Sequence, residues 1–343
     1  MQSSEAPGVK GITPKVVVVG SINCDLTTYL EKFPRPNETV MGLRSFLTLG
    51  GKGLNQAVAA ARVGADVQML ACVGRDNFGT MARDYLAANR VATTLLRMTD
   101  KASTGTASVL VDSHAHNMIA VATGANGLLT PGDVYRAEPV IAAADVLIVQ
   151  MELPFETVKA ALMLAASYGV TTVLNPAPAS TRVLELLPYA SVVTPNETEL
   201  ELIAGVCVDD ESGLVAGLKK MNQAGARLAL VTRGEKGCIF LGDEAQGVVP
   251  AFRVAAIDST GAGDVFNGVF AASLVAQVTV TDSVEGRFCE QHLQWAIGRA
   301  SAAAALSVTR PLAQDAAPFT DEIDALMSAQ SLAAHSGALV SLG

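Results

Sequence analysis

The segment Ile257–Gly268, which reads IDSTGAGDVFNG, decides the fold that the sequence predicts. A short β-favouring run, Phe252–Ile257, precedes it, and this run predicts a strand. An apolar-periodic run, Val265–Val278, follows it and predicts a helix. The segment is therefore expected to form a tight turn that leads from a strand into a helix.

Two glycines and one carboxylate stand at this predicted turn. Gly261 and Gly263 let the backbone bend sharply and let another group approach it closely. The first N–H groups of a helix lack internal partners and face the positive end of the helix dipole, so a phosphate fits there. Asp264 adds a carboxylate at the mouth of such a site. The alternative interpretation is that Asp264 only caps the helix behind a glycine turn.

A second glycine cluster, Gly50–Gln56, reads GGKGLNQ and opens an alanine-rich helix predicted over Leu54–Val63. It is not a P-loop, because Lys52 is followed by Gly53 rather than by serine or threonine. Alone, it could be a flexible turn with a solvated lysine. Two glycine-rich helix starts in one chain, one with a lysine and one with an aspartate, favour a pair of ligand-binding turns.

Strands alternate with helices along most of the chain, which favours a parallel sheet covered on both faces. The predicted fold class is α/β, a three-layer αβα doubly wound and mainly parallel sheet in a single domain over 16–330, with flexible tails at 1–15 and 331–343. Strands are predicted at 16–19, 67–73, 146–150, 171–174, 191–194, 228–232 and 237–241, and further helices at 77–89, 155–168, 197–204, 213–224, 290–307 and 320–329.

Two other segments, 25–49 and 104–122, lack helical periodicity. Prolines and an asparagine punctuate the first segment, and the second is β-like with a polar turn at 112–117. We expect the second segment to form a hairpin that pairs with the first. Together they predict a small β-sheet inserted into the larger domain.

Composition and charge exclude several classes of function. The net charge of −9 and the absence of a basic run argue against a nucleic-acid partner. No apolar run approaches the ~18 residues of a membrane span, and the first fifteen residues lack the apolar stretch of a signal peptide. Five scattered cysteines without a C-x-x-C pair suggest neither a zinc site nor a disulfide framework, and they favour a reducing, cytoplasmic location. The four histidines lack metal-like spacing and are expected on surface turns or helix faces. They are His114, His116, His292 and His335.

Polar side chains recur where predicted strands end. Ligands of doubly wound sheets collect at the carboxyl ends of the strands, so these residues are candidates for one composite site. Each of them could also be an ordinary polar loop residue. They are Asn23, Asp25, Glu152, Asn196, Glu199 and the run Thr232–Gly234.

From about Val16 to Leu326 the chain resembles the ribokinase-like family of sugar and nucleoside kinases. Segment 50–57, GGKGLNQA, resembles the first family signature, and segment 258–264, DSTGAGD, resembles the second and more specific one. Segments 20–25 (GSINCD), 175–178 (NPAP) and 194–199 (TPNETE) resemble the ribokinase branch in particular.

The resemblance implies transfer of the γ-phosphoryl group of ATP to a sugar hydroxyl, which for this branch is O5 of D-ribose. Asp264 matches the catalytic base of the family, and the amides of Gly261, Ala262 and Gly263 match its anion hole. The positions that match sugar contacts are Asn23, Asp25, Gly51, Lys52, Gly53, Asn55, Glu152 and Asp264. Those that match ATP contacts are Asn196, Thr232, Arg233, Gly234, Glu235, Lys236, Gly237, Gly263 and Ser301.

The resemblance also implies two cations. Glu199 matches a residue that is linked through water to the Mg²⁺ that accompanies ATP. An activating K⁺ is expected near the loop Pro311–Ala316, although this loop lacks the glycine and the serine that are expected around its second and last positions. The positions that match this monovalent-cation site are Asp258, Thr260, Ser307, Arg310, Leu312 and Ala316.

The small β-sheet matches the lid of the family, and we expect a homodimer formed through it. A two- to four-stranded sheet that stands off the core is only marginally stable alone, and its edge strands have unpaired backbone groups that can pair with another chain. Packing against a second lid would bury residues such as Phe46 and Val109.

Three other functions remain open from the sequence. The chain could phosphorylate another small sugar or a nucleoside, or it could be a sugar- or nucleotide-binding regulator without catalysis. The intact Asp264 and Lys52 argue against the regulator. A dinucleotide-dependent oxidoreductase is disfavoured, because neither glycine cluster is a dinucleotide fingerprint.

Overall fold

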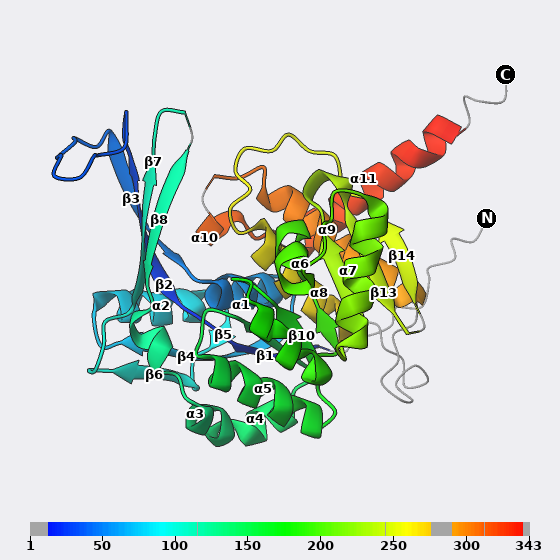
Figure 1. The fold of residues 1–343 in the computed structure, drawn as a ribbon, viewed down its shortest axis with the longest axis horizontal. Coiled ribbons are helices and arrows are strands. Elements are labelled where there is room, and N and C mark those ends of the chain that lie inside the picture. The colour runs from blue at the N-terminus through cyan, green and yellow to red at the C-terminus, as the bar shows by residue number, and fades with distance from the viewer. Residues whose placement is uncertain (1–12, 115, 244, 276–289, 312, 339–343) are drawn as a thin grey trace, which may run out of the picture.

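The computed structural model describes residues 13–114, 116–243, 245–275, 290–311 and 313–338. A large sheet crosses the molecule with helices on both faces, and a small sheet stands away from it at the left of Figure 1. This is the three-layer αβα architecture with a mainly parallel sheet that the sequence predicts. In the described part of the chain, no helix combines the length and hydrophobicity that crossing a bilayer requires.

The first strand of the chain, β1 (Lys15–Val19), lies in the interior of the large sheet, and its run of valines is buried on both faces. The chain first builds outward on one side of β1, then crosses back to its other side at β9 (Val146–Gln150). All neighbouring strands are parallel except the pairs β12–β13 and β13–β14. The described order is β14 (Gln246–Val249), β13 (Cys238–Gly242), β12 (Leu228–Thr232), β11 (Val192–Val193), β10 (Thr171–Asn175), β9, β1, β4 (Asp66–Gly74) and β5 (Val91–Ala92), with β6 (Leu96–Thr99) also paired to β4.

Alternate residues of β1 enter two different hydrophobic cores, because successive side chains of a strand point to opposite faces. Val16 and Val18 pack into one core, and Val17 and Val19 pack into the other. The first core lies under α1 (Lys52–Arg62), α2 (Asn77–Ala88), α8 (Ala262–Val275), α9 (Glu290–Ser307) and α11 (Thr320–Ala338). The second lies under α3 (Pro131–Arg136), α4 (Glu138–Ala142), α5 (Phe155–Ser167), α6 (Glu197–Ala204) and α7 (Glu211–Gln223).

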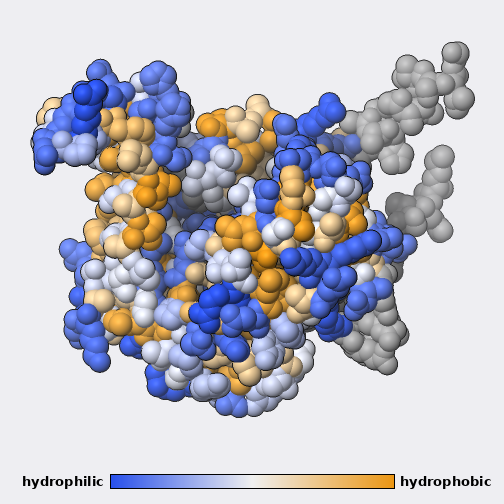
Figure 2. Space-filling view, viewed as in Figure 1, coloured by the Kyte–Doolittle hydropathy of each residue, from blue (hydrophilic) through white to orange (hydrophobic). Residues whose placement is uncertain are grey.

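The small sheet takes its strands from the two segments assigned to it. Its order is β3 (Arg44–Gly50), β2 (Asn23–Tyr29), β7 (Gly105–Val111) and β8 (Asn117–Ala122). β7 and β8 form the expected hairpin, and β2 pairs with β7 in parallel. Hydrophobic surface covers the stem of this sheet, and its tip is hydrophilic (Figure 2).

The strand predicted over Phe252–Ile257 is wrong, because the structure has irregular backbone there. Its last residue does not pair with a neighbouring strand. The N–H groups of Ile257 and of the following Asp258 donate to the Val308 carbonyl, at 2.7 and 3.1 Å. The turn before α8 therefore rests against the C-terminal end of α9.

Other differences concern where elements begin and end. α8 begins at Ala262 rather than at position 265, and positions 276–278 of the predicted helix lie outside the described residues. α1 begins at Lys52 because Gly51 is its N-cap. α11 continues to Ala338, so residues 331–338, expected in a flexible tail, are helical. The other tail residues, 1–12 and 339–343, lie outside the described chain.

Candidate active site

A cavity opens where the carboxyl ends of β10, β11 and β12 meet the N-termini of α1, α6 and α8. This is the edge at which ligands bind in doubly wound sheets. Seven of its lining residues are predicted site residues from distant parts of the sequence. Asn23, Asp25 and Glu152, which were also expected in the composite site, are not among the lining residues. The lining residues are Lys52, Asn175, Ala177, Thr194, Asn196, Glu199, Thr232, Gly261, Gly263, Asp264 and Asn267.

The Asp264 carboxylate is 7% exposed and is held by side-chain amides. Asn55 Nδ2 donates to one carboxylate oxygen and Gln56 Nε2 donates to the other, both at 3.0 Å. Gln56 is itself fixed, because its Oε1 accepts from Gln150 Nε2 at 2.7 Å and its Nε2 also donates to Asn175 Oδ1 at 3.1 Å. Neutral donors therefore fix the orientation of Asp264, and within the described residues no ion pair to its oxygens is found.

Gly263 lines the cavity in the first turn of α8. A Cβ built on it would meet no atom within 4 Å, so packing within the protein does not require glycine there. The open space lies beside a helix start, where a phosphate can approach the backbone. In contrast, the N–H of Ala262 donates to the Ser259 carbonyl at 3.2 Å, so that predicted anion-hole amide is engaged within the turn.

Lys52 begins α1 and supplies the positive charge of the cavity. Burial lowers the pKa of its ammonium group, but the nearby carboxylates of Asp264, Glu152 and Glu199 outweigh burial and raise this pKa above its ordinary value. Lys52 is therefore fully charged at neutral pH, surrounded by three carboxylates. Such a group can neutralise part of the charge of a bound phosphate.

The residues expected to hold a sugar lie beyond β1 and β9, at the point where the order of strands reverses. Glu152 follows β9, and its Oε2 accepts from Ser21 Oγ and from the Lys52 backbone N–H. Asn23 is 5% exposed, and its Oδ1 accepts from Asn126 Nδ2 at 2.8 Å. Gly51 is the N-cap residue of α1. Two residues later, the Gly53 N–H donates to Ser21 Oγ at 3.4 Å.

Asp25 carries the most perturbed carboxyl group of this region. Burial and the neighbouring charge of Glu152 raise its pKa to about 6. Among the described residues, no group donates a hydrogen bond to the buried Asp25 Oδ1, and Asn55 Oδ1 is likewise without a donor. Buried polar atoms are rarely left unpaired in folded proteins, so these two oxygens remain available as hydrogen-bond acceptors.

The residues expected around ATP extend from the cavity along one edge. Asn196 forms a β-bridge with Thr232, and both line the cavity. Beyond Thr232, a turn that includes Gly234, Glu235 and Gly237 is tied down where Arg233 and Lys236 pair with Glu197, at 3.1 and 3.7 Å. Ser301 is buried in α9 against Cys238, and it is not among the cavity-lining residues.

Glu199 faces the same cavity from α6. One of its oxygens accepts from the Asn196 N–H while the Asn196 side chain accepts from the Glu199 N–H, which is a reciprocal capping box. Burial raises the pKa of Glu199, against the opposing effects of the Asn196 N–H and of Lys52. Glu199, Asp264 and Asn196 give this side of the cavity oxygen ligands of the kind that Mg²⁺ prefers.

The residues expected around a monovalent cation lie behind the α8 turn. Asp258 Oδ1 accepts from the Thr260 N–H at 2.9 Å, and the Ser307 hydroxyl donates to the Ala304 carbonyl. Arg310 pairs with Glu322 and also donates to the Ala316 carbonyl. Leu312 lies outside the described residues.

Several residues of the site were not predicted individually, although their motifs were. Gln56, Asn175, Thr194 and Asn267 all fall within quoted motifs, and together they orient the first turn of α8. Asn267 Nδ2 donates to the Gly263 carbonyl at 2.8 Å, and its Oδ1 accepts from Thr194 Oγ1 at 2.6 Å. The available signal was the cluster of amide residues at strand ends and helix starts.

The family model described as "pfkB family carbohydrate kinase" matches residues 13–320. A ribokinase of Haemophilus influenzae is 37% identical over 307 residues, which cover 90% of this chain and 96% of the relative. A deoxyribokinase of Salmonella typhi is 37% identical over 259 residues, which cover 75% of this chain and 84% of the relative. The solved structure of Arabidopsis thaliana ribokinase complexed with ribose and ATP superposes with a TM-score of 0.82 at 25% identity, over 92% of this chain and 99% of that one.

The raised pKa of Asp25 predicts the pH dependence of the enzyme. An ionised Asp25 accepts hydrogen bonds from hydroxyl groups, so kcat/KM for the sugar should fall as the pH drops through about 6 and Asp25 takes up a proton. Asp25→Asn should have a low kcat/KM at pH 8, and its kcat/KM should not fall further as the pH drops through about 6. The measurement is kcat/KM from pH 5 to 8.5 for both proteins. An acid limb of equal size in both would belong to the nucleotide and would contradict the assignment.

Proposed function

Because the chain belongs to the pfkB family of carbohydrate kinases, we propose that it transfers the γ-phosphoryl group of ATP to O5 of D-ribose, giving D-ribose 5-phosphate and ADP. The observation that carries the proposal is the meeting of Asp264, Lys52 and Gly263 in one cavity. It combines a proton acceptor, a cation and an accessible helix start. The ribokinase relatives support ribose as the acceptor.

Asp264 accepts the proton of the attacking hydroxyl in the proposed mechanism. Phosphoryl transfer passes through a loose transition state, so the placement of the nucleophile matters more than the strength of the base. The amides of Asn55 and Gln56 hold both carboxylate oxygens, which fixes the acceptor before the substrate arrives. A buried carboxylate on neutral donors is suited to that role.

The charge of the moving phosphoryl group is stabilised by the start of α8 and by Lys52. Gly263 exposes backbone beside the cavity, and the helix dipole adds partial positive charge there. These groups are in place before the reaction, so little reorganisation is needed as charge develops. Lys52 lines the same cavity, and the nearby carboxylates keep it protonated.

Asp25, Asn23 and Glu152 select the acceptor in this proposal. They follow β1 and β9 in the chain and supply carboxylate and amide groups. A carboxylate accepts from two adjacent hydroxyl groups of a sugar, and the unpaired Asp25 Oδ1 is the atom that lacks such a donor. A polar site of this kind rejects a substrate that lacks the matching hydroxyl.

Glu199, with Asn196 and Asp264 beside it, would hold Mg²⁺ through water on the nucleotide side of the cavity. Bound Mg²⁺ would neutralise charge on the transferred phosphates. This chain's own part is to keep Glu199 oriented, which the capping box with Asn196 does.

We also propose that K⁺ activates the enzyme. The Asp258 carboxylate and the carbonyls around it are oxygen donors, and the guanidinium of Arg310 is neutralised by Glu322. These residues fit a monovalent cation, which would screen Asp258 and hold the turn before α8. We further propose a cytoplasmic location, since Cys24, Cys72, Cys207 and Cys238 are free thiols.

An acceptor panel tests the proposed substrate. In a coupled assay of ADP release, D-ribose should give the highest kcat/KM among pentoses, 2-deoxyribose, hexoses and nucleosides. The deoxyribokinase relative makes 2-deoxyribose the sharpest competitor, since it lacks one hydroxyl that a polar site can read. Equal or higher kcat/KM for 2-deoxyribose, fructose or adenosine would assign the chain to another acceptor.

Asp264→Asn should reduce kcat by about 10²–10⁴-fold, the usual contribution of a general base. The new amide nitrogen faces an amide donor, so we expect a stability loss of about 1 kcal/mol and a folded protein that still binds ATP. Asp100→Asn, a change of an exposed carboxylate outside the cavity, is the matched control. More than a tenth of the wild-type kcat in Asp264→Asn would remove this residue from the role.

Potassium should raise the initial rate several-fold. The test compares KCl with a tetraalkylammonium chloride, each at about 100 mM so that ionic screening is equal. Asp258→Asn should abolish the difference between the two salts, because it removes the proposed carboxylate ligand. Identical wild-type rates in both salts would show that the loop at 311–316 has lost the cation.

The small sheet should mediate a homodimer. The register places Phe46, Val109 and Ile119 in one row across the sheet, on the same face as Asp25. Ile119→Lys should therefore weaken the dimer in light scattering at micromolar concentration. Met118→Lys is the matched control, because Met118 is equally exposed, at 55% against 58%, but faces the other side. A monomeric wild type, or equal effects of the two changes, would contradict the interface.

A further inference from the structure

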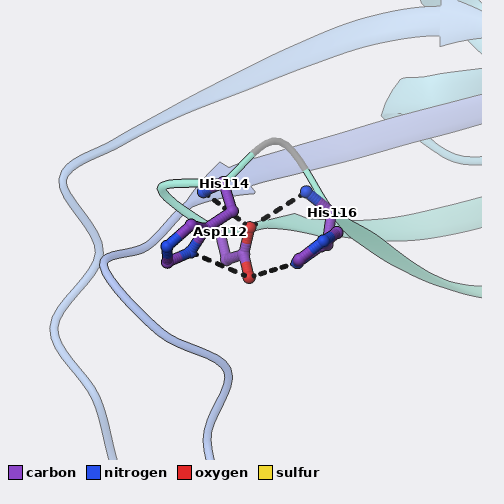
Figure 3. A group of neighbouring side chains, drawn as sticks. All are labelled: Asp112, His114 and His116. Carbon is purple, nitrogen blue, oxygen red and sulfur yellow. Dashed lines mark hydrogen bonds and ion pairs between the residues drawn. The ribbon is translucent and has the colours of Figure 1, made fainter.

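The turn between β7 and β8 carries a side-chain cluster that the proposed kinase reaction does not use. Asp112, His114 and His116 alternate along this turn, at the hydrophilic tip of the small sheet (Figures 2 and 3). Both histidines are predicted on the surface, and their spacing in the sequence is not typical of metal ligands. The surface position is correct, but the reversal of the chain brings three potential metal ligands together, with one ligand atom of each within 4.8 Å of the others.

The backbone of the turn orients the carboxylate. Asp112 Oδ1 accepts from the backbone N–H groups of His114 and His116, both at 2.9 Å. This leaves Asp112 Oδ2 facing the two imidazoles, at 3.1 Å from His116 Nδ1 and 3.9 Å from His114 Nδ1 (Figure 3). Hydrogen bonds that fix one carboxylate oxygen and aim the other are typical of the support around metal ligands.

We propose that Asp112, His114 and His116 bind one Zn²⁺ ion, with water completing the coordination. Zinc binds imidazole nitrogen and carboxylate oxygen at about 2.0–2.2 Å, which places tetrahedral ligands about 3.4 Å apart. The Asp112–His116 pair is already near that separation. The histidine side chains are 76% and 72% exposed, so they can rotate the remaining distance without disturbing a core.

The donor set also excludes the cations of the kinase reaction. Mg²⁺ and K⁺ prefer ligands made entirely of oxygen, whereas two imidazoles with one carboxylate favour zinc and its transition-metal neighbours. The cluster belongs to the small sheet, and the residues proposed to hold Mg²⁺ lie on α6 and α8 around the cavity. Zinc at the turn would join its two sides across the end of the β7–β8 hairpin.

Calorimetric titration of the full-length, EDTA-treated and dialysed protein with ZnCl₂ at pH 7.5 tests the proposal. The wild type should bind one equivalent at this site, and His114→Ala, His116→Ala and Asp112→Asn should each weaken binding by at least about tenfold. Asp112→Asn retains an oxygen for the turn amides while removing the anionic ligand. MgCl₂ should give no heat that depends on these residues.

Two control variants separate the cluster from other zinc ligands. Asp100→Asn changes an exposed carboxylate outside the cluster, and Cys207→Ser removes an exposed thiol elsewhere. Both should bind zinc as the wild type does, and circular dichroism should show all five variants folded. Absence of binding in the wild type, wild-type affinity in His116→Ala and Asp112→Asn, or loss of binding in Cys207→Ser would overturn the site.

Discussion

The close packing of α1 against α8 is the constraint on which the active site depends. Gly268 permits it, because a Cβ there would lie 2.3 Å from the Gln56 carbonyl oxygen and 2.8 Å from Ala59 Cβ. At this distance Asn55 and Gln56, on α1, reach the Asp264 carboxylate at the start of α8. Two glycine-rich helix starts that are about 200 residues apart in the sequence thereby become one site. A larger residue at position 268 would separate the Asp264 carboxylate from the amides that orient it.

The strand order explains why the two ends of the site differ in chemistry. The residues after β1 and β9 lie where the order reverses, and they carry Asp25 and Glu152, whose mutual repulsion and burial keep the pKa of Asp25 high. The residues after β11 and β12 lie farther along the sheet and carry Asn196 and Thr232. Lys52 and Asp264, at the starts of α1 and α8, line the cavity together with Asn196 and Thr232.

The sequence predicted the parts of the fold that local patterns encode. Buried β-branched runs such as Val16–Val19 and capped helices such as Glu197–Ala204 were found because one periodicity dominates each of them. Phe252–Ile257 was assigned wrongly because its apolar composition resembles a strand, while its backbone partner, the Val308 carbonyl, is distant in sequence. The role of Gln56 and the cluster at Asp112 were missed for the same reason. Both depend on geometry that appears only after the chain folds.

The loop 311–316, which departs from the expected family pattern, is hydrogen-bonded to distant parts of the chain. Gln314 Oε1 accepts from the Leu49 N–H at 2.7 Å, and the Gln314 carbonyl accepts from the Tyr85 hydroxyl. Arg62 fixes the next residues by donating to the carbonyls of Asp315 and Ala317. Leu49 is near the end of β3, immediately before the turn that presents Lys52. The loop proposed to sense K⁺ is therefore hydrogen-bonded to the strand that connects the small sheet to the turn before α1.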